Sequence, residues 1–164
     1  MSTAHKTRWL DAQEQQIWEQ LSTMILRLQP VLNAQLQREF GISHFEYLMM
    51  ARLSEAPGSK LRMSVLATIT GSSLPRLSQA VGRLEKRGWI SRHPDTEDSR
   101  YTLAVLTRAG FRRLQEVAPS HVGAVREFVF DRLTRAQARQ LGAISQRILD
   151  GLPPDDSWPS TTPS

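Results

Sequence analysis

Arginine side chains on one helical stretch are the residues of this 164-residue chain best suited to chemistry. Between residues 72 and 87, at about 100° per residue, a set of polar and small side chains falls within roughly a quarter-turn of the helix. Guanidinium and amide groups there can bind phosphate oxygens and reach base edges, and small neighbours permit close approach. The set is Ser72, Arg76, Gln79, Ala80, Arg83 and Arg87.

The opposite side of the same stretch is apolar. We expect it to face the core, as in any amphipathic helix. Ser72 or Ser73 can cap the N-terminus, and Pro75 suits the first turn. The apolar residues are Leu74, Leu77, Val81 and Leu84.

The elements around this helix decide how it is interpreted. An isolated basic helix is most simply a solvated surface. Here a helix over residues 63–69 and a turn at Gly71 precede it. A hairpin over Trp89–His93 and Arg100–Leu106 follows it. That order is typical of a winged helix-turn-helix, in which one helix enters the major groove of DNA beside a β-ribbon.

The tip of the predicted hairpin is mostly acidic, with Asp95, Glu97 and Asp98 beside Arg100. It can be an ordinary polar turn, since carboxylates repel phosphate. Alternatively, Asp98 orients Arg100 by a charge-assisted hydrogen bond for a narrow minor groove. The residues predicted to contact DNA are Ser72, Ser73, Arg76, Gln79, Arg83, Arg87, Arg92, His93, Asp98, Ser99 and Arg100.

The net charge of +5 is concentrated in the same region. Residues 59–116 hold eleven Lys or Arg against five Asp or Glu, whereas residues 1–58 carry −1 and residues 117–164 carry zero. A concentrated basic excess favours double-stranded DNA as a partner.

Long apolar helices are predicted at both ends, so the fold is expected to be mainly α with a small β-hairpin wing. The first spans about residues 9–40, with Pro30 expected to kink or divide it. At about 45 Å it exceeds what a small domain needs, which favours a homodimer.

Capping boxes at Ser43 and Thr134 begin later helices. The predicted units are an N-terminal dimerisation helix (1–40), a winged helix-turn-helix (41–110), C-terminal dimerisation helices (111–150) and a mobile tail (151–164).

Aromatic and methionine side chains provide a candidate ligand pocket between the predicted dimerisation helices and the winged helix-turn-helix. Trp9, Trp18, Phe45 and Met49 are the candidates, and residues of these types are more often core.

Catalysis, cofactors and metals are not expected. The four histidines (His5, His44, His93 and His121) are scattered and fit no zinc motif, and no nucleotide-binding loop or nucleophile elbow occurs. There is no cysteine, no signal peptide and no apolar run long enough to span a membrane, so we expect a cytoplasmic protein.

The hairpin region resembles the multiple-antibiotic-resistance-regulator (MarR) family of bacterial transcription factors. The resemblance covers about residues 9–150 and is strongest in the wing. It implies a homodimer that binds a pseudo-palindromic operator, represses nearby genes and is released by a small phenolic or lipophilic ligand. The matching residues are Ser72-Ser73-Leu74-Pro75, Gly88-Trp89-Ile90-Ser91-Arg92, Asp98-Ser99-Arg100 and Leu106-Thr107-Arg108-Ala109-Gly110.

The resemblance assigns the family's wing roles to Asp98 and Arg100. Ser99 stands where a second basic residue is frequent, so a less positive wing tip is expected. The absence of cysteine excludes release by cysteine oxidation. Two alternatives stay open: a winged-helix module that binds protein, and a DNA-binding regulator without a small-molecule effector.

Overall fold

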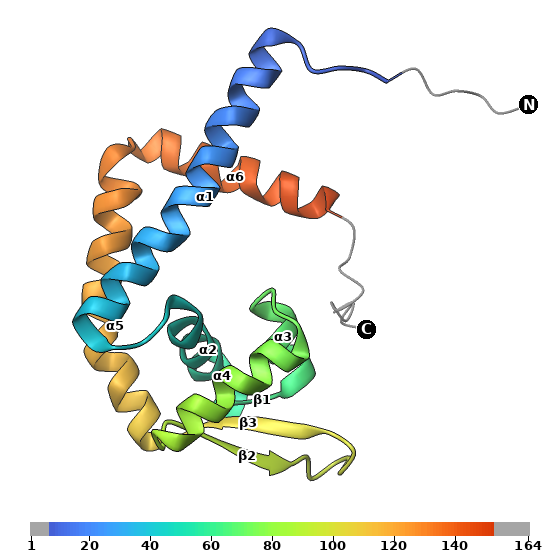
Figure 1. Ribbon diagram of the computed structural model, residues 1–164, viewed down its shortest axis with the longest axis vertical. Coiled ribbons are helices and arrows are strands. Elements are labelled where there is room, and N and C mark those ends of the chain that lie inside the picture. The colour runs from blue at the N-terminus through green and yellow to red at the C-terminus, as the bar shows by residue number, and fades with distance from the viewer. Residues whose placement is uncertain (1–6, 153–164) are drawn as a thin grey trace, which may run out of the picture.

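The computed structural model describes residues 7–152 and has a compact lobe from which long helices rise (Figure 1). The N-terminal residues that include His5, and the predicted tail beyond Leu152, lie outside the described residues. The predicted fold class, mainly α with a small β wing, is confirmed. The elements are α1 (Ala12–Phe40), α2 (His44–Glu55), η1 (Pro57–Ser59), β1 (Lys60–Arg62), α3 (Met63–Ile69), α4 (Leu74–Lys86), β2 (Ile90–Pro94), β3 (Thr102–Leu106), α5 (Arg108–Phe128), η2 (Phe130–Arg132) and α6 (Arg135–Gly151).

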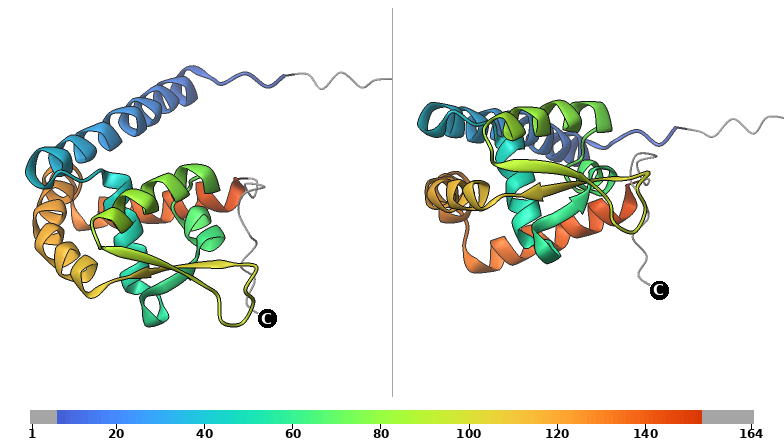
Figure 2. Two further views of the ribbon diagram at one scale, coloured as in Figure 1. Left: turned by 60° about the horizontal axis from the view of Figure 1, so that its bottom comes forward. Right: turned by 90° about the horizontal axis from the view of Figure 1, so that it is seen from below.

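The lobe packs α2, α3 and α4 against a three-stranded antiparallel sheet in the order β1-β3-β2 (Figure 2). In register, Leu61 of β1 faces Ala104 of β3, and Ser91 of β2 faces Val105 of β3. Strand β1 was not predicted, because three residues are too few to show an alternating pattern. The core side chains that are fully buried include Met49, Leu53, Leu66, Leu77, Leu84 and Ile90.

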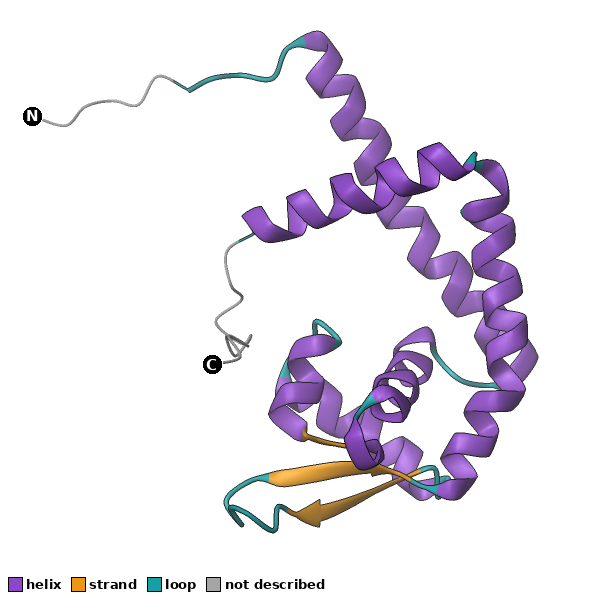
Figure 3. Ribbon diagram, turned by 180° about the vertical axis from the view of Figure 1, so that it is seen from behind, coloured by secondary structure: helices purple, strands orange, loops and turns teal. Residues whose placement is uncertain are grey.

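Helices α1, α5 and α6 extend beyond the lobe, although Leu36 of α1 and Leu114 and Val117 of α5 belong to its core (Figure 3). Of the two effects expected of Pro30, a kink or a division, division is wrong, since α1 runs through the proline. The proline removes one backbone hydrogen bond, but the carbonyl it frees belongs to Leu26, an exposed residue, so water can satisfy it. Likewise, α5 continues through Pro119. No described helix is both long and apolar enough to cross a membrane.

Local signals in the sequence begin and end these helices. The capping boxes predicted at Ser43 and Thr134 are confirmed, and a third, at Asp11, begins α1. Gly71 has φ +60°, a left-handed conformation that suits glycine, and it forms the turn between α3 and α4. The turn at Gly71 therefore leads into α4 as the sequence predicted. The exposure of Ser72 and Leu74 differs from the prediction, as described below.

Candidate nucleic-acid interface

The exposed face of α4 and its C-cap carry four of the eleven predicted DNA contacts. Arg76, Gln79, Arg83 and Arg87 are all exposed, whereas the predicted core residues Leu77, Val81 and Leu84 on the same helix are fully buried. The angular count therefore placed these seven residues on the correct sides of the helix.

Three residues contradict the angular count: Ser72 and Leu74 where α4 begins, and Ala80 in its middle, which packs in the core. Ser72 is 6% exposed and Ala80 only 1%, so neither belongs to the outward surface. Leu74, expected in the core, is 48% exposed. Helical angles do not apply before α4 begins at Leu74, because the Ser72 N–H bonds the Ala67 carbonyl in the preceding turn. Ser73 is exposed at the N-cap position, but its side chain makes no capping hydrogen bond.

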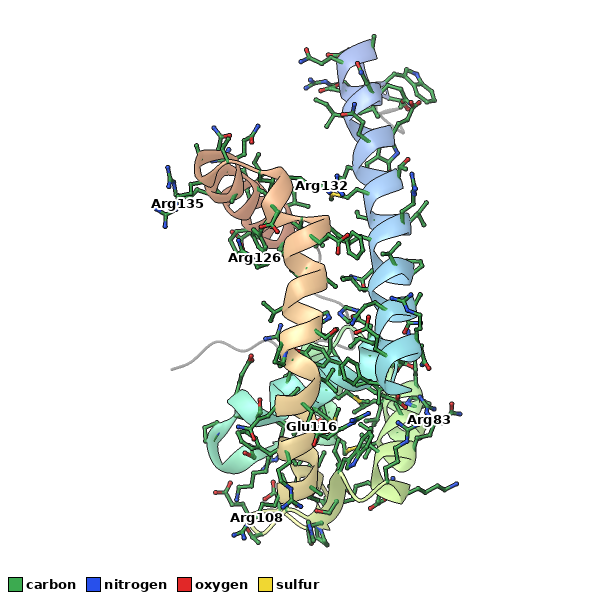
Figure 4. The ribbon with its side chains drawn as sticks, turned by 90° about the vertical axis from the view of Figure 1, so that its left-hand side faces the viewer. Arg83, Arg108, Glu116, Arg126, Arg132 and Arg135 are labelled. Atoms are coloured by element: carbon green, nitrogen blue, oxygen red, sulfur yellow. The ribbon has the colours of Figure 1, made fainter. Side chains whose placement is uncertain are left out.

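Arg83 has a partner that the sequence analysis missed. Its Nε donates to Oε1 of Glu46 at 2.9 Å. Burial alone would raise the pKa of Glu46, but hydrogen bonds from the Ser43 N–H and the Arg83 guanidinium bring that pKa below its usual range. The carboxylate is therefore ionised at neutral pH. Figure 4 shows Arg83 on the lobe, well apart from Arg126, Arg132 and Arg135 of the upper helices.

Arg76 and Arg87 each lie over an aromatic ring. The guanidinium carbon of Arg76 is 4.9 Å from the centre of the Phe45 ring, and that of Arg87 is 5.1 Å from a Trp89 ring centre. Cation–π contacts of this kind restrain an exposed arginine while leaving its N–H groups available.

The predicted hydrogen bond between Asp98 and Arg100 at the wing tip is confirmed. Arg100 Nη2 donates to Asp98 Oδ2 at 2.6 Å, and its Nε donates to Oδ1 at 2.9 Å. The hydrogen bonds from Arg100 hold the pKa of Asp98 below its usual range. The Arg100 side chain is nevertheless 83% exposed, so an oriented guanidinium stands at the edge of the protein.

Asp95, which the sequence analysis placed among acidic tip residues, is buried instead. Its Oδ2 accepts Arg62 Nε at 2.6 Å, and its Oδ1 accepts the Glu97 N–H. Arg62 also lies over the Tyr101 ring, 4.4 Å from its centre. This ion pair joins β1 to the hairpin and fixes where the wing leaves the lobe.

A groove of about 260 Å³ lies between α4 and the wing and brings distant predicted residues together. Arg92 and Arg100 line it with Leu74, which explains the exposure of that leucine. Arg92 is held by two hydrogen bonds to Glu85 Oε2, at 2.7 and 3.1 Å. On the hairpin, His93 and Ser99 are exposed, and His93 Nε2 lies 2.9 Å from the Ser91 hydroxyl.

The wing motif at Gly88 and Leu106–Gly110 closes the base of the hairpin. The Thr107 hydroxyl donates to the Gly88 carbonyl at 2.6 Å and accepts the Gly110 N–H at 3.0 Å. The Thr107 N–H bonds the Trp89 carbonyl at 3.0 Å. Gly88, with φ +73°, provides the left-handed turn that brings these groups together. The start of α5 is thereby joined to the end of α4.

The four predicted ligand residues do not share a cavity in one chain. Phe45 lines a cavity of about 570 Å³, but Met49 is fully buried in the core. Trp9 and Trp18 are 83% and 55% exposed near the far end of α1. The cavity draws on the middle of α1, on α2, on the end of α3 and on α4, because helices far apart in sequence converge there. Its lining is Gln29, Pro30, Asn33, His44, Phe45, Leu48, Thr70 and Arg76.

Two of the scattered histidines meet beside this cavity. The rings of His44 and His121 are 5.2 Å apart between centres, and Tyr47 lies 4.3 Å from His121. His44 Nδ1 is 2.9 Å from Gln29 Oε1. Burial lowers the pKa of both histidines below the ordinary 6.5, and for His44 the neighbouring His121 adds to the shift.

The shifted pKa values of His44 and His121 predict an acid-sensitive fold. The unfolded chain binds protons on them more readily than the folded one, so stability is full above about pH 6.5 and decreases as the pH falls below it. We expect the Tm to be lower at pH 5.5 than at pH 7.5. Thermal unfolding followed by circular dichroism measures this, and His121→Gln should flatten the dependence. An equal wild-type Tm at both pH values would contradict the assignment.

Comparison with known proteins supports the same interpretation. A family model described as MarR family matches residues 40–100. The MarR family transcriptional regulator Sco3205 from Streptomyces coelicolor, crystallised in complex with DNA, is 41% identical; the alignment covers 94% of this chain and 98% of that one, with a TM-score of 0.89. AbsC, a MarR family regulator from the same organism, is 35% identical over 88% of this chain and 97% of that one, with a TM-score of 0.82.

A curated relative is more distant. The transcriptional repressor MprA of Escherichia coli K12 is 28% identical over 112 residues, which are 68% of this chain. The match spans 63% of the length of that repressor. Taken with the geometry of α4 and the wing, the match to Sco3205 over nearly its whole length shows that this chain belongs to the MarR family of transcriptional regulators.

Proposed function

We propose that this chain is a homodimeric repressor that binds a pseudo-palindromic DNA operator and is released by a small aromatic or lipophilic ligand. The observation that carries the proposal is the exposed basic face of α4 beside the oriented guanidinium of Arg100. In this arrangement α4 enters the major groove and the wing reaches the adjacent minor groove. The crystal structure of Sco3205 in complex with DNA supports it by analogy.

Exposed apolar side chains on the outer helices support the homodimer. Among the described residues of α6 none is buried, and Ile144, Ile148 and Leu149 are each about half exposed. On α1, Ile17 and Ile25 are exposed in the same way. Apolar surface of this extent is typical of a face that a partner covers. A second copy would place two α4 helices about one DNA turn apart.

The cavity beside Phe45 supports release by a ligand. Its volume of about 570 Å³ lies in the range of small-molecule sites, and it combines apolar walls from Pro30 and Leu48 with the cation of Arg76. Because Arg76 belongs to α4, a bound ligand would contact the reading helix directly. A panel of substituted phenols screened for release of bound duplex tests this part of the proposal.

The decisive experiment is a mobility shift with DNA from the region upstream of the gene for this protein, repeated across a salt series. We expect the binding constant to fall steeply as salt is added. Each neutralised phosphate contributes about −0.9 to the slope of log K against the logarithm of the salt concentration. Absent or salt-insensitive binding would instead favour a winged-helix module that binds protein.

Arg100→Ala tests the wing. We expect a loss of affinity of roughly tenfold from the minor-groove contact, with the dimer and the preference for sequence in the major groove unchanged. Fluorescence anisotropy on the bound duplex measures the affinity, and light scattering reports the dimer. Wild-type affinity in Arg100→Ala would show that the wing does not contact DNA.

A further inference from the structure

Glu46 is a carboxylate fixed at the N-terminus of α2. Its Oε2 accepts the Ser43 N–H at 2.9 Å, and its Oε1 accepts Arg83 Nε at 2.9 Å. Only 5% of the Glu46 side chain is exposed, against 55% of the Arg83 side chain. One member of this ion pair is therefore held inside the protein while the other reaches solvent.

The hydrogen bonds around Glu46 leave it little freedom. The Ser43 hydroxyl accepts the Glu46 N–H at 3.1 Å, which completes a reciprocal capping box. One residue further, the His44 N–H donates to Oδ1 of Asn33 on α1 at 3.0 Å. The end of α2 is thus attached to α1, and its carboxylate is a rigid point against which an arginine of α4 can be placed.

Arg83 uses only part of its hydrogen-bonding capacity in this pair. Among residues 7–152, it hydrogen-bonds Glu46 through Nε alone, which leaves the N–H groups of both terminal nitrogens for a ligand. A guanidinium that binds guanine needs two N–H groups for O6 and N7. A free arginine must also lose side-chain freedom when it binds, and a preformed ion pair reduces that loss.

We propose that Glu46 is a positioning residue for base recognition, which holds the Arg83 guanidinium on the exposed face of α4 so that its terminal N–H groups meet a base edge. The proposal rests on the proposed function, in which α4 enters the major groove. It assigns Glu46 a role beyond capping α2, and it joins the specificity of α4 to the position of α2.

The test compares two duplexes of equal length: one enriched from random sequence by the wild-type protein, and one unrelated. E46Q keeps the size of the side chain and removes its charge. We expect binding of the enriched duplex to weaken about tenfold and binding of the unrelated duplex to change less than about twofold. E46D, which keeps the charge but shortens its reach, should lose the same discrimination and serves if E46Q does not fold.

A double-mutant cycle separates positioning from a purely structural role. In an R83Q background, E46Q should have no further effect on discrimination between the two duplexes, because the arginine that Glu46 positions is already absent. Ser43→Ala is the matched control: it removes the hydroxyl of the capping box and lowers the thermal stability. The backbone N–H of residue 43 that holds Oε2 of Glu46 remains, so the ratio of the two affinities should be kept. Wild-type discrimination in E46Q and E46D, or a loss in E46Q that persists in R83Q, would overturn the role of Glu46.

Failure of the underlying function gives a different result. If the wild-type protein enriches no duplex, or binds DNA without salt dependence, then both the proposed function and the role of Glu46 are overturned. If wild type discriminates and the Glu46 variants discriminate equally well, only the positioning role is overturned.

Discussion

Ile144→Glu is expected to abolish operator binding while each chain keeps its fold. Ile144 is 58% exposed on α6, where none of the described residues is buried, so a charge there costs a separate chain little. In the proposed homodimer the same side chain is covered by the partner. An unpaired charge buried in an apolar interface costs on the order of several kcal/mol, which weakens association more than about a hundredfold. Separate chains then lose the simultaneous contact with two half-sites.

Light scattering of the purified variant measures the dimer, and a mobility shift on the same preparation measures DNA binding. Ala143→Glu is the matched control, because it adds the same charge to an exposed residue about 100° around α6 from Ile144, away from Ile148. This control should stay dimeric and bind DNA. A dimeric Ile144→Glu with wild-type DNA affinity would show that α6 does not form the interface.

Gly110→Ala is expected to lower the free energy of unfolding by about 3 kcal/mol. A Cβ at residue 110 would lie 2.1 Å from the Trp89 carbonyl oxygen and 2.8 Å from Cδ1 of Leu106. The Trp89 carbonyl oxygen is a backbone atom that accepts the Thr107 N–H at the base of the wing, so it cannot rotate away as a side chain would. Relief requires α5 to separate from the wing, which breaks the hydrogen bonds of Thr107.

Urea unfolding followed by circular dichroism measures the loss. The control is Gly123→Ala on the same helix, where a Cβ meets nothing within 4 Å. It should instead stabilise the protein by roughly 0.5–1 kcal/mol, because alanine loses less backbone freedom than glycine in a helix. Equal stability of Gly110→Ala and wild type would contradict the packing at the wing base.

The sequence predicted features that depend on neighbouring residues. Capping boxes, the turn at Gly71 and the inward leucines of α4 follow from spacings of a few residues. The hydrogen bond between Asp98 and Arg100 spans two residues, and its parts lie in one tight turn. Two of the three errors on this helix, at Ser72 and Leu74, fell where local periodicity begins. The third, Ala80, lies three residues after Leu77 and four before Leu84, so it shares their buried side.

Contacts between distant segments could not be predicted in this way. Glu46 and Arg83 are 37 residues apart, and Arg62 and Asp95 are 33 apart. The capping-box pattern accounts for Glu46 fully, so nothing in the sequence indicates a second partner. Arg62 lies in a strand of three residues that has no pattern of its own. His44 and His121 likewise meet only because α2 packs against α5.

The unbroken course of α5 has a mechanical consequence. Its 21 residues make a rod of about 32 Å that starts at the wing base and ends beside the proposed dimer helices. A rotation of that rod by about 5° about its end beside the dimer helices moves the wing base by about 3 Å, close to the rise of one base pair. In the proposed homodimer, a small change in the angle between the two copies would therefore alter the spacing of their α4 helices by about one base-pair step.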